Sequence, residues 1–229
     1  MKDRIYSPIN LLAAIVALAA FVIPSTAFAD EPRTGTSIDF FGTVRAGACD
    51  PGDPSVGMIN GNTPDSSLVY GAPPDRACVA VTAPDGHQLT LGEFKSIEGV
   101  ARINCVNRGT LVNVHLTGLV PRGVYSAWIP VTAGNIFPPA IAATAMGSVL
   151  GDTTFVNTFN ASASGEGQLT LIQPAGTGTL MPGPIPLCLL DTAHFEIHVA
   201  YHMDGQTHGG VPGPPPTWVV QERFLFPHQ

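Results

Sequence analysis

The chain has 229 residues, a formal net charge of −7 and only 12% charged residues, while hydrophobic residues make up 45% of it. Nucleic acids and anionic lipid surfaces attract proteins through clustered cations, and 10 lysines and arginines against 17 acidic residues do not supply them. A chain so poor in charge is also unlike a disordered protein. The composition therefore predicts a globular protein that does not bind nucleic acid.

The first 29 residues have the three-part pattern of a secretory signal peptide. Lys2 and Arg4 precede an uncharged apolar run over 11–23, and small residues stand at Ala27 and Ala29. The run is shorter than the roughly 20 apolar residues that span a bilayer, although an uncleaved anchor is the alternative. We expect cleavage after Ala29 and a secreted or periplasmic protein without an integral membrane segment.

Four cysteines remain after that cleavage. An even number of cysteines in an exported protein predicts two disulfides, because the compartment is oxidising. We favour Cys49–Cys78, which would tie an irregular, Pro/Gly-rich loop at about residues 46–80, and Cys105–Cys188, which would join two strand-like segments. Zinc–thiolate ligation is the alternative, but the chain has no C-x-x-C pair.

Short runs of alternating hydrophobic and polar residues, separated by glycines and prolines, predict β-strands. They occupy residues 37–44, 101–109, 110–118, 124–131, 153–163, 167–174, 193–202 and 217–226. Such spacing is typical of an all-β fold: an antiparallel β-sandwich, or a partly closed barrel, of about 7–9 short strands. We expect residues 30–229 to form one such domain.

One or two short helices are also expected. Thr90 and Glu93 have the spacing of a capping box, which predicts a helix or turn over 90–94. The alanine-rich segment 138–151 is the second candidate helix. Residues 50–76 show no periodicity and are predicted to be a long irregular loop.

The segment 194–202, HFEIHVAYH, carries three of the seven histidines. Its apolar positions alternate with polar ones, so a strand would bury Phe195, Ile197, Val199 and Tyr201 on one face. The opposite face would carry His194, Glu196, His198, Ala200 and His202. We interpret the segment as a strand whose histidines line the outer face of a sheet, or a second interface if that face is covered.

The favoured interpretation involves no cofactor. The alternative is a metal or acid–base site on this strand, with zinc or copper as the ion. Strand neighbours i and i+2 lie roughly 6.7 Å apart and i and i+4 about 13 Å, whereas zinc–nitrogen bonds are about 2.0–2.1 Å. The workable pairs are therefore His194 with Glu196 and Glu196 with His198. Each needs further ligands from a neighbouring strand, of which His115 is the candidate.

His208 is predicted to lie apart from this face. Asp204-Gly205 is typical of a two-residue hairpin turn, which would set Tyr201 opposite His208. Residues opposite one another share a face, so His208 would point to the core side and away from His202. A loop of three or five residues would change this register.

Motifs for nucleophilic catalysis or phosphate binding are absent from the sequence, which contains neither G-x-S-x-G nor a P-loop. Tyr125, Trp128 and Trp218 are predicted to anchor the core, because large aromatics supply the volume that a thin sandwich needs. An adhesin or carbohydrate-binding module would instead require Trp128 and Trp218 to be exposed and close together.

The segments 118–128, GLVPRGVYSAW, and 198–202, HVAYH, carry a resemblance. The chain resembles a set of uncharacterised bacterial exported proteins in which a G-L-x-P turn and a Y-x-x-W strand precede an H-x-x-Y-H segment. The resemblance implies a bacterial source and a sandwich fold. It implies no activity, cofactor or site.

Two functional hypotheses follow from the sequence. The first is a non-enzymatic exported β-sandwich that serves as a binding or structural module of the cell envelope, with partners and oligomeric state undefined. The second is a metal-binding protein or metal-dependent enzyme that uses Glu196 and His198 with His194 or His115. Convergence of these side chains on one point would favour the second hypothesis.

Overall fold

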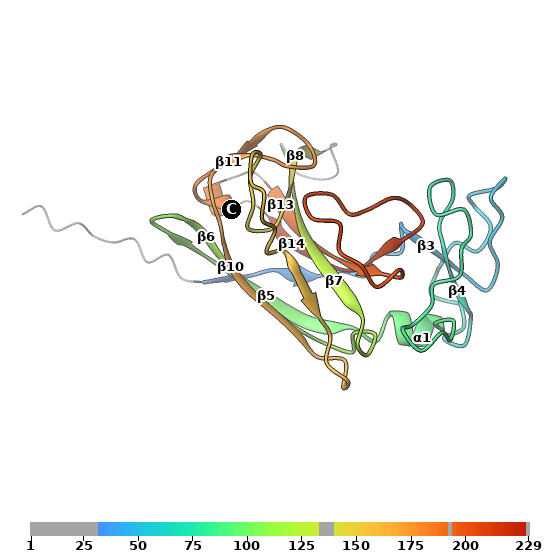
Figure 1. Cartoon of the computed structure of the whole chain (residues 1–229). Helices are drawn as coiled ribbons and strands as arrows, with labels where there is room; N and C mark the ends of the chain where they lie inside the picture. The colour runs from blue at the N-terminus through green and yellow to red at the C-terminus, as the bar shows by residue number, and fades with distance from the viewer. Residues whose placement is uncertain (1–31, 133–139, 192–193, 228–229) are drawn as a thin grey trace, which may run out of the picture.

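The computed structural model describes residues 32–132, 140–191 and 194–227, so the predicted signal peptide lies outside the described residues. Two antiparallel sheets form the body of the molecule (Figure 1). The first sheet has the order β1 (Arg33–Thr34), β5 (Glu98–Val106), β6 (Gly109–Thr117) and β10 (Gly167–Gln173). The second has the order β2 (Thr36–Ser37), β14 (Trp218–Pro227), β13 (His194–His202), β7 (Val124–Thr132) and β8 (Ala140–Ala145), and β9 (Thr158–Asn160) also pairs with β7.

The core lies between the inner faces of these two sheets. Val112 and Leu116 of β6 are fully buried in one cluster with Ile197 and Val199 of β13, and Tyr125 of β7 is enclosed with them. Alternation of side chains along each strand sends these residues inward. The predicted antiparallel all-β fold is therefore confirmed as a sandwich rather than a closed barrel.

Smaller elements close the ends of the sandwich. Two further strand pairs join β3 (Val44–Ala46) to β4 (Val69–Gly71) and β11 (Gly176–Thr177) to β12 (Pro184–Ile185). The helical segments are α1 (Leu91–Phe94) and the 3-10 turn η1 (Leu189–Asp191). Figure 1 shows β3, β4 and α1 gathered at one end of the molecule. No helix in the described ranges is long and apolar enough to cross a membrane.

The short helix predicted over 90–94 is confirmed. The Thr90 side chain accepts a hydrogen bond from the Glu93 backbone N–H at 3.3 Å, and the Glu93 carboxylate accepts one from the Thr90 backbone N–H at 2.8 Å. This reciprocal capping box satisfies amide groups that the first turn of a helix leaves without partners.

The second predicted helix, over 138–151, is wrong where it can be described. Ala140–Ala145 forms β8 and pairs with β7. Alanine has the highest helix propensity, but intrinsic propensity is small per residue, and pairing with a buried strand outweighs it here. The small side chain of Ala145 also leaves room for Trp128, which it contacts from the next strand.

Two other boundaries differ from those expected. Within the predicted strand 37–44, only Ser37 and Val44 belong to strands, each at the end of a different short element. The predicted irregular loop 50–76 contains β4, whose Val69 is fully buried in the main core. Both segments contribute edge strands that are too short for periodicity to reveal.

Both disulfides join the cysteines that were favoured from the sequence. Cys49 is bonded to Cys78 with a Cα–Cα distance of 5.6 Å, and Cys105 to Cys188 with 5.3 Å. The first ties the irregular segment that precedes β4 to the one that follows it. The second ties β5 of the first sheet to the residue before η1, which leads into β13 of the second sheet.

Candidate functional site

Part of the outer face of the second sheet is covered. Trp128, Ala145 and Ala200 form a second apolar cluster there, and Phe155 and Trp218 pack against it. Ala200 is only 1% exposed as a result. The predicted strand 194–202 is therefore confirmed, and at this end its histidine-bearing face is a second interface, the alternative that was expected for a covered face.

Towards the other end of β13 the same face is hollowed. A cavity of about 460 Å³, here called the histidine groove, is mostly apolar and is bounded by β7, β13, β14 and the segment that follows β2. Its walls include Ile38, Phe40, Pro130, Thr132, Ala140 and Leu225. A second hollow of about 260 Å³ shares Phe40 and Pro130 with it and extends to Trp128 and Trp218.

Three polar side chains form the floor of the histidine groove. His198 Nε2 lies 2.6 Å from Glu196 Oε2, and Arg223 Nε lies 3.4 Å from the same oxygen. Phe40 stacks on the His198 ring with centroids 5.8 Å apart, and the Arg223 guanidinium lies 5.1 Å from the Phe40 ring centroid. The Glu196 carboxylate is thus held between nitrogen atoms of His198 and Arg223, and the Phe40 ring packs on His198.

The charge of Glu196 is stabilised despite its environment. Burial alone would raise the pKa of this carboxyl group, but the hydrogen bond to His198 and the nearby His198, Arg223 and His194 outweigh it, so the pKa is lowered. The carboxylate is therefore ionised at neutral pH. Its Oε2 faces not only His198 but also the permanently charged guanidinium of Arg223, and this cation would repel a metal ion at the same oxygen.

The predicted metal residues are only partly brought together. His194, Glu196 and His198 all line the histidine groove, and Glu196 and His198 form the ion pair described above. His115 lies on β6 of the first sheet, where it is exposed and sits opposite Gln168 of β10. The prediction that His115 completes the set is wrong, because β6 and β13 belong to different sheets.

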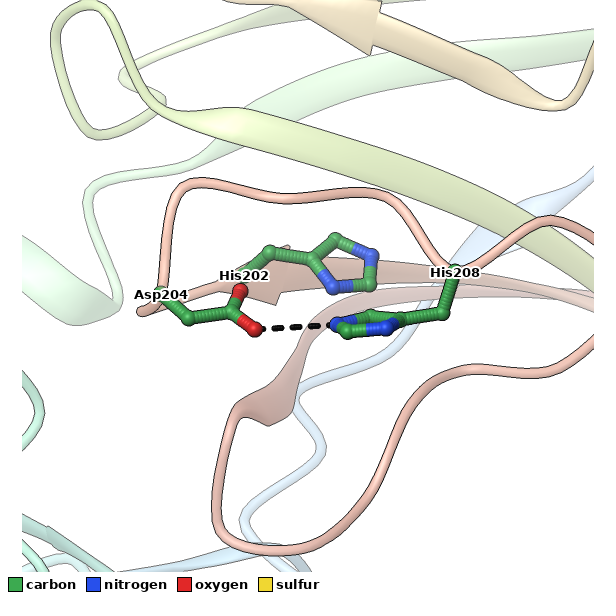
Figure 2. Close-up of side chains that lie close together, drawn as sticks. All are labelled: His202, Asp204 and His208. Atoms are coloured by element: carbon green, nitrogen blue, oxygen red, sulfur yellow. Dashed lines mark hydrogen bonds and ion pairs between the residues drawn. The ribbon is translucent and has the colours of Figure 1, made fainter.

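A different set of three ligand-type side chains converges at the end of β13. One ligand atom from each of His202, Asp204 and His208 lies within 4.8 Å of the others. His208 Nε2 is 2.9 Å from Asp204 Oδ2, and the two imidazole rings have centroids 5.8 Å apart. Figure 2 shows both rings and the carboxylate turned toward one another. We call these residues the His202 triad.

The His202 triad exists because the predicted two-residue hairpin does not form. His202 pairs with Trp218, so residues 203–217 form a long connection between β13 and β14. The half of this connection that is rich in glycine and proline does not continue the strand, because proline has no backbone N–H to donate to a neighbouring strand. Gly209 and Gly210 pack on Phe155 instead. The prediction that His208 points away from His202 is therefore wrong.

A signal for this cluster was present in the sequence. His202, Asp204 and His208 form an H-x-D-x-x-x-H pattern around a turn, and this spacing allows the three side chains to meet when the connection is longer than a two-residue hairpin. Strand alternation alone hides the pattern, because it assigns His202 to an exposed face.

His202 is held rigidly in the sheet. Its Nε2 lies 2.7 Å from Ser126 Oγ, and Ser126 Oγ also accepts a hydrogen bond from Trp128 Nε1 at 2.8 Å. The side chain is 1% exposed, and burial lowers its pKa to about 4, so the imidazole is neutral at pH 7. Its other nitrogen, Nδ1, is buried without a hydrogen-bond partner.

The predicted aromatic anchors lie where expected, with one exception. Tyr125 is fully buried and Trp128 is 5% exposed. Trp218 is half-buried: Arg76 lies over its ring at 4.1 Å from the centroid, and its indole N–H donates to the Gly213 carbonyl at 3.1 Å. Since Trp128 is not accessible, these residues do not form the exposed platform of a carbohydrate-binding module.

Comparison of the chain with models of protein families, with curated proteins and with solved structures finds no match. The resemblance to bacterial exported proteins through the 118–128 and 198–202 segments therefore stays a prediction.

Proposed function

We propose that this protein is an exported, non-enzymatic binding protein that holds a small and mostly apolar ligand in the histidine groove. The observation that carries the proposal is the cavity of about 460 Å³ on the outer face of the second sheet. Ligand pockets are typically concave, largely apolar and supplied with a few convergent polar groups. The two disulfides agree with an oxidising, exported setting.

The polar floor specifies what the ligand carries. His198, Glu196 and Arg223 sit together in a mostly apolar cavity that His194 and Thr132 also line. Two nitrogen-bearing side chains, His198 and Arg223, accompany the single carboxylate of this floor. The fitting ligand is therefore an apolar ring or chain with one hydrogen-bond-accepting or anionic group.

The proposal is tested with 1-anilinonaphthalene-8-sulfonate, a probe with apolar rings and one anionic group. We expect saturable one-to-one binding with increased emission, because the rings enter the apolar cavity and leave water. Thr132→Phe places a ring inside the groove and should weaken binding at least about tenfold, the loss that corresponds to about 1.4 kcal/mol.

Thr117→Phe is the matched control. Thr117 is exposed on β6 of the first sheet, so the same chemical change there leaves the groove untouched. Equal probe binding by the two variants, or non-saturable binding by the unaltered protein, would contradict the proposal. Unfolding midpoints of both variants show whether the fold is retained.

A further inference from the structure

We infer that His202, Asp204 and His208 form a binding site for one transition-metal ion of the zinc type. The site lies at the end of β13, where the connection 203–217 leaves the sheet. It does not depend on the ligand proposed for the histidine groove.

The geometry is close to that of a coordinated ion. Tetrahedral zinc with bonds of about 2.1 Å holds its ligand atoms roughly 3.3 Å apart. His208 Nε2 and Asp204 Oδ2 are 2.9 Å apart, and the three ligand atoms lie within 4.8 Å of one another. A closure of roughly 1–2 Å by the exposed Asp204 and half-buried His208 side chains completes the three bonds.

The buried nitrogen of His202 supplies a second and independent indication. Leaving a buried polar atom without a partner costs about 1–3 kcal/mol, so such atoms usually have a reason. Nδ1 of His202 is such an atom, and Figure 2 shows this side of the ring turned toward Asp204 and the His208 ring. A metal ion between the three side chains would give that nitrogen its partner.

The surroundings of His202 prepare it as a ligand. When Nε2–H donates to Ser126 Oγ, the proton is fixed on Nε2 and the lone pair of Nδ1 faces the triad. Metal-ligating histidines generally donate their other ring N–H in this way, which fixes the tautomer and the ring orientation. Trp128, which also bonds Ser126 Oγ, links the site to the second apolar cluster.

The other two ligands are positioned by the connection itself. Asp204 Oδ1 accepts a hydrogen bond from the Gln206 backbone N–H at 3.1 Å, which leaves Oδ2 to face His208. Gly213 has φ +96°, and a Cβ at that position would lie 2.3 Å from the His208 ring. The chain therefore passes directly against the imidazole, and only glycine fits there.

The donor set determines the class of ion. Two imidazole nitrogens and one carboxylate suit zinc, copper or nickel, whereas calcium and magnesium prefer oxygen ligands. Three protein ligands leave a fourth position free. A cleft of about 400 Å³ lined by His202, Asp204 and Arg122 adjoins the site, so water or a small anion has access to that position.

Zinc titration of the purified protein, without a polyhistidine tag, tests the inference by isothermal calorimetry. We expect one zinc ion per chain with a dissociation constant of about 1 µM or tighter, and a weakening of about 100-fold or more in both His208→Gln and Asp204→Asn. Cobalt substitution should give the intense visible absorption of a four-coordinate ion, and that absorption should be lost in the same variants.

Three matched histidine variants are the controls. His198→Gln removes the ion pair of the groove, and His115→Gln an exposed histidine of the first sheet. His87→Gln breaks an exposed cluster in which His87 contacts Asp85 at 2.6 Å and Glu93 at 3.2 Å. All three should bind zinc as the unaltered protein does.

Absence of stoichiometric binding, retention of binding in both triad variants, or its loss in a control would overturn the inference. If the triad variants do not fold, the unaltered protein decides the question. The Trp128 indole N–H, which shares Ser126 Oγ with His202, should shift in the nitrogen–proton NMR spectrum when zinc is added. An unmoved Trp128 signal would overturn the inference.

Discussion

The two sheets have outer faces of opposite character. On the first sheet, His115 and Thr117 of β6 are exposed and alternate regularly with buried neighbours. On the second sheet, Ala200 and His202 occupy the corresponding outward positions of β13 and are each 1% exposed. The same alternation of polar and apolar residues thus produces a solvent-exposed outer face in the first sheet and a covered outer face with a cavity in the second.

The difference shows what alternation can and cannot specify. It fixes which side chains share a face, and hydrophobicity then decides which face turns to the main core. What covers the other face depends on loops that are distant in sequence. Here Phe155 and the connection 203–217 provide that cover for the second sheet.

The largest expected effect comes from truncating the second apolar cluster. Trp128→Ala should lower the free energy of unfolding by about 3–5 kcal/mol, as for a core aromatic, because it leaves a cavity beneath Phe155. Thr117→Ala on the exposed face of the first sheet should change it by less than about 0.5 kcal/mol. Urea unfolding of both variants measures the contrast, and similar values would remove the distinction between the two outer faces.

Much of the fold follows from particular residues in the sequence. The inward positions Val112, Val114 and Leu116 and the capping box at Thr90 were predictable, because period-two alternation and capping chemistry are local. The strand at Ala140–Ala145 was not, since its alanines indicate a helix and only pairing with β7 makes it a strand.

The candidate site was predictable only in its residue types. Histidines of 194–202 were recognised, and His194, Glu196 and His198 do share a groove. The His202 triad was missed because Asp204-Gly205 favours a tight hairpin, whereas the pairing of His202 with Trp218 makes the connection long. Loop length is set by tertiary pairing, which a local turn motif does not report.

Glu222 of β14, in the second sheet, should make the free energy of unfolding depend on pH. The side chain is 3% exposed, and burial, with help from Asp39, raises its pKa to about 7 despite hydrogen bonds from the Arg223 backbone and Ser37. Between the unfolded value of 4.5 and about 7, the folded chain then holds more protons than the unfolded chain. The contribution of Glu222 to the free energy of unfolding therefore falls as pH rises through this range, whereas buried His202, whose pKa is lowered from 6.5 to about 4, contributes a rise of similar size between those two values.

Glu222→Gln should remove the contribution of Glu222 and leave that of His202. The free energy of unfolding of the variant, taken relative to the unaltered protein, should therefore be about 3 kcal/mol higher at pH 8 than at pH 4, since one pKa unit corresponds to 1.36 kcal/mol. Glu98→Gln, at an exposed position of β5 in the first sheet, is the control and should show no such pH-dependent difference from the unaltered protein. Denaturant unfolding at several pH values checks both. A stability difference between Glu222→Gln and the unaltered protein that does not change with pH would contradict the assignment to Glu222.

Ser126→Ala should lower the free energy of unfolding by less than Trp128→Ala does, but by an amount still typical of a buried polar residue. The substitution leaves the Trp128 indole N–H and His202 Nε2 without their shared partner, and we expect a loss of about 1–3 kcal/mol. Ser126→Thr keeps a hydroxyl and is the companion variant for thermal unfolding. A loss no greater than that of an exposed serine would show that this face tolerates unpaired groups.

The smallest expected effect lies on the first sheet. Thr170 Oγ1 donates to Asn113 Oδ1 at 2.9 Å across β10 and β6, with both side chains on the outer face. Thr170→Ala should cost about 0.5 kcal/mol or less, because water replaces an exposed hydrogen bond. A loss as large as that of Ser126→Ala, measured by urea unfolding, would mean that the first sheet is also covered.

The most direct test of a functional outer face on the second sheet is an amide NMR map of the protein as zinc is added. We predict shifts confined to residues 202–208 and their contacts at Ser126 and Trp128, with β5, β6 and β10 unchanged. Shifts centred instead on His115 or on the His87 cluster, or no shifts at all, would contradict the account.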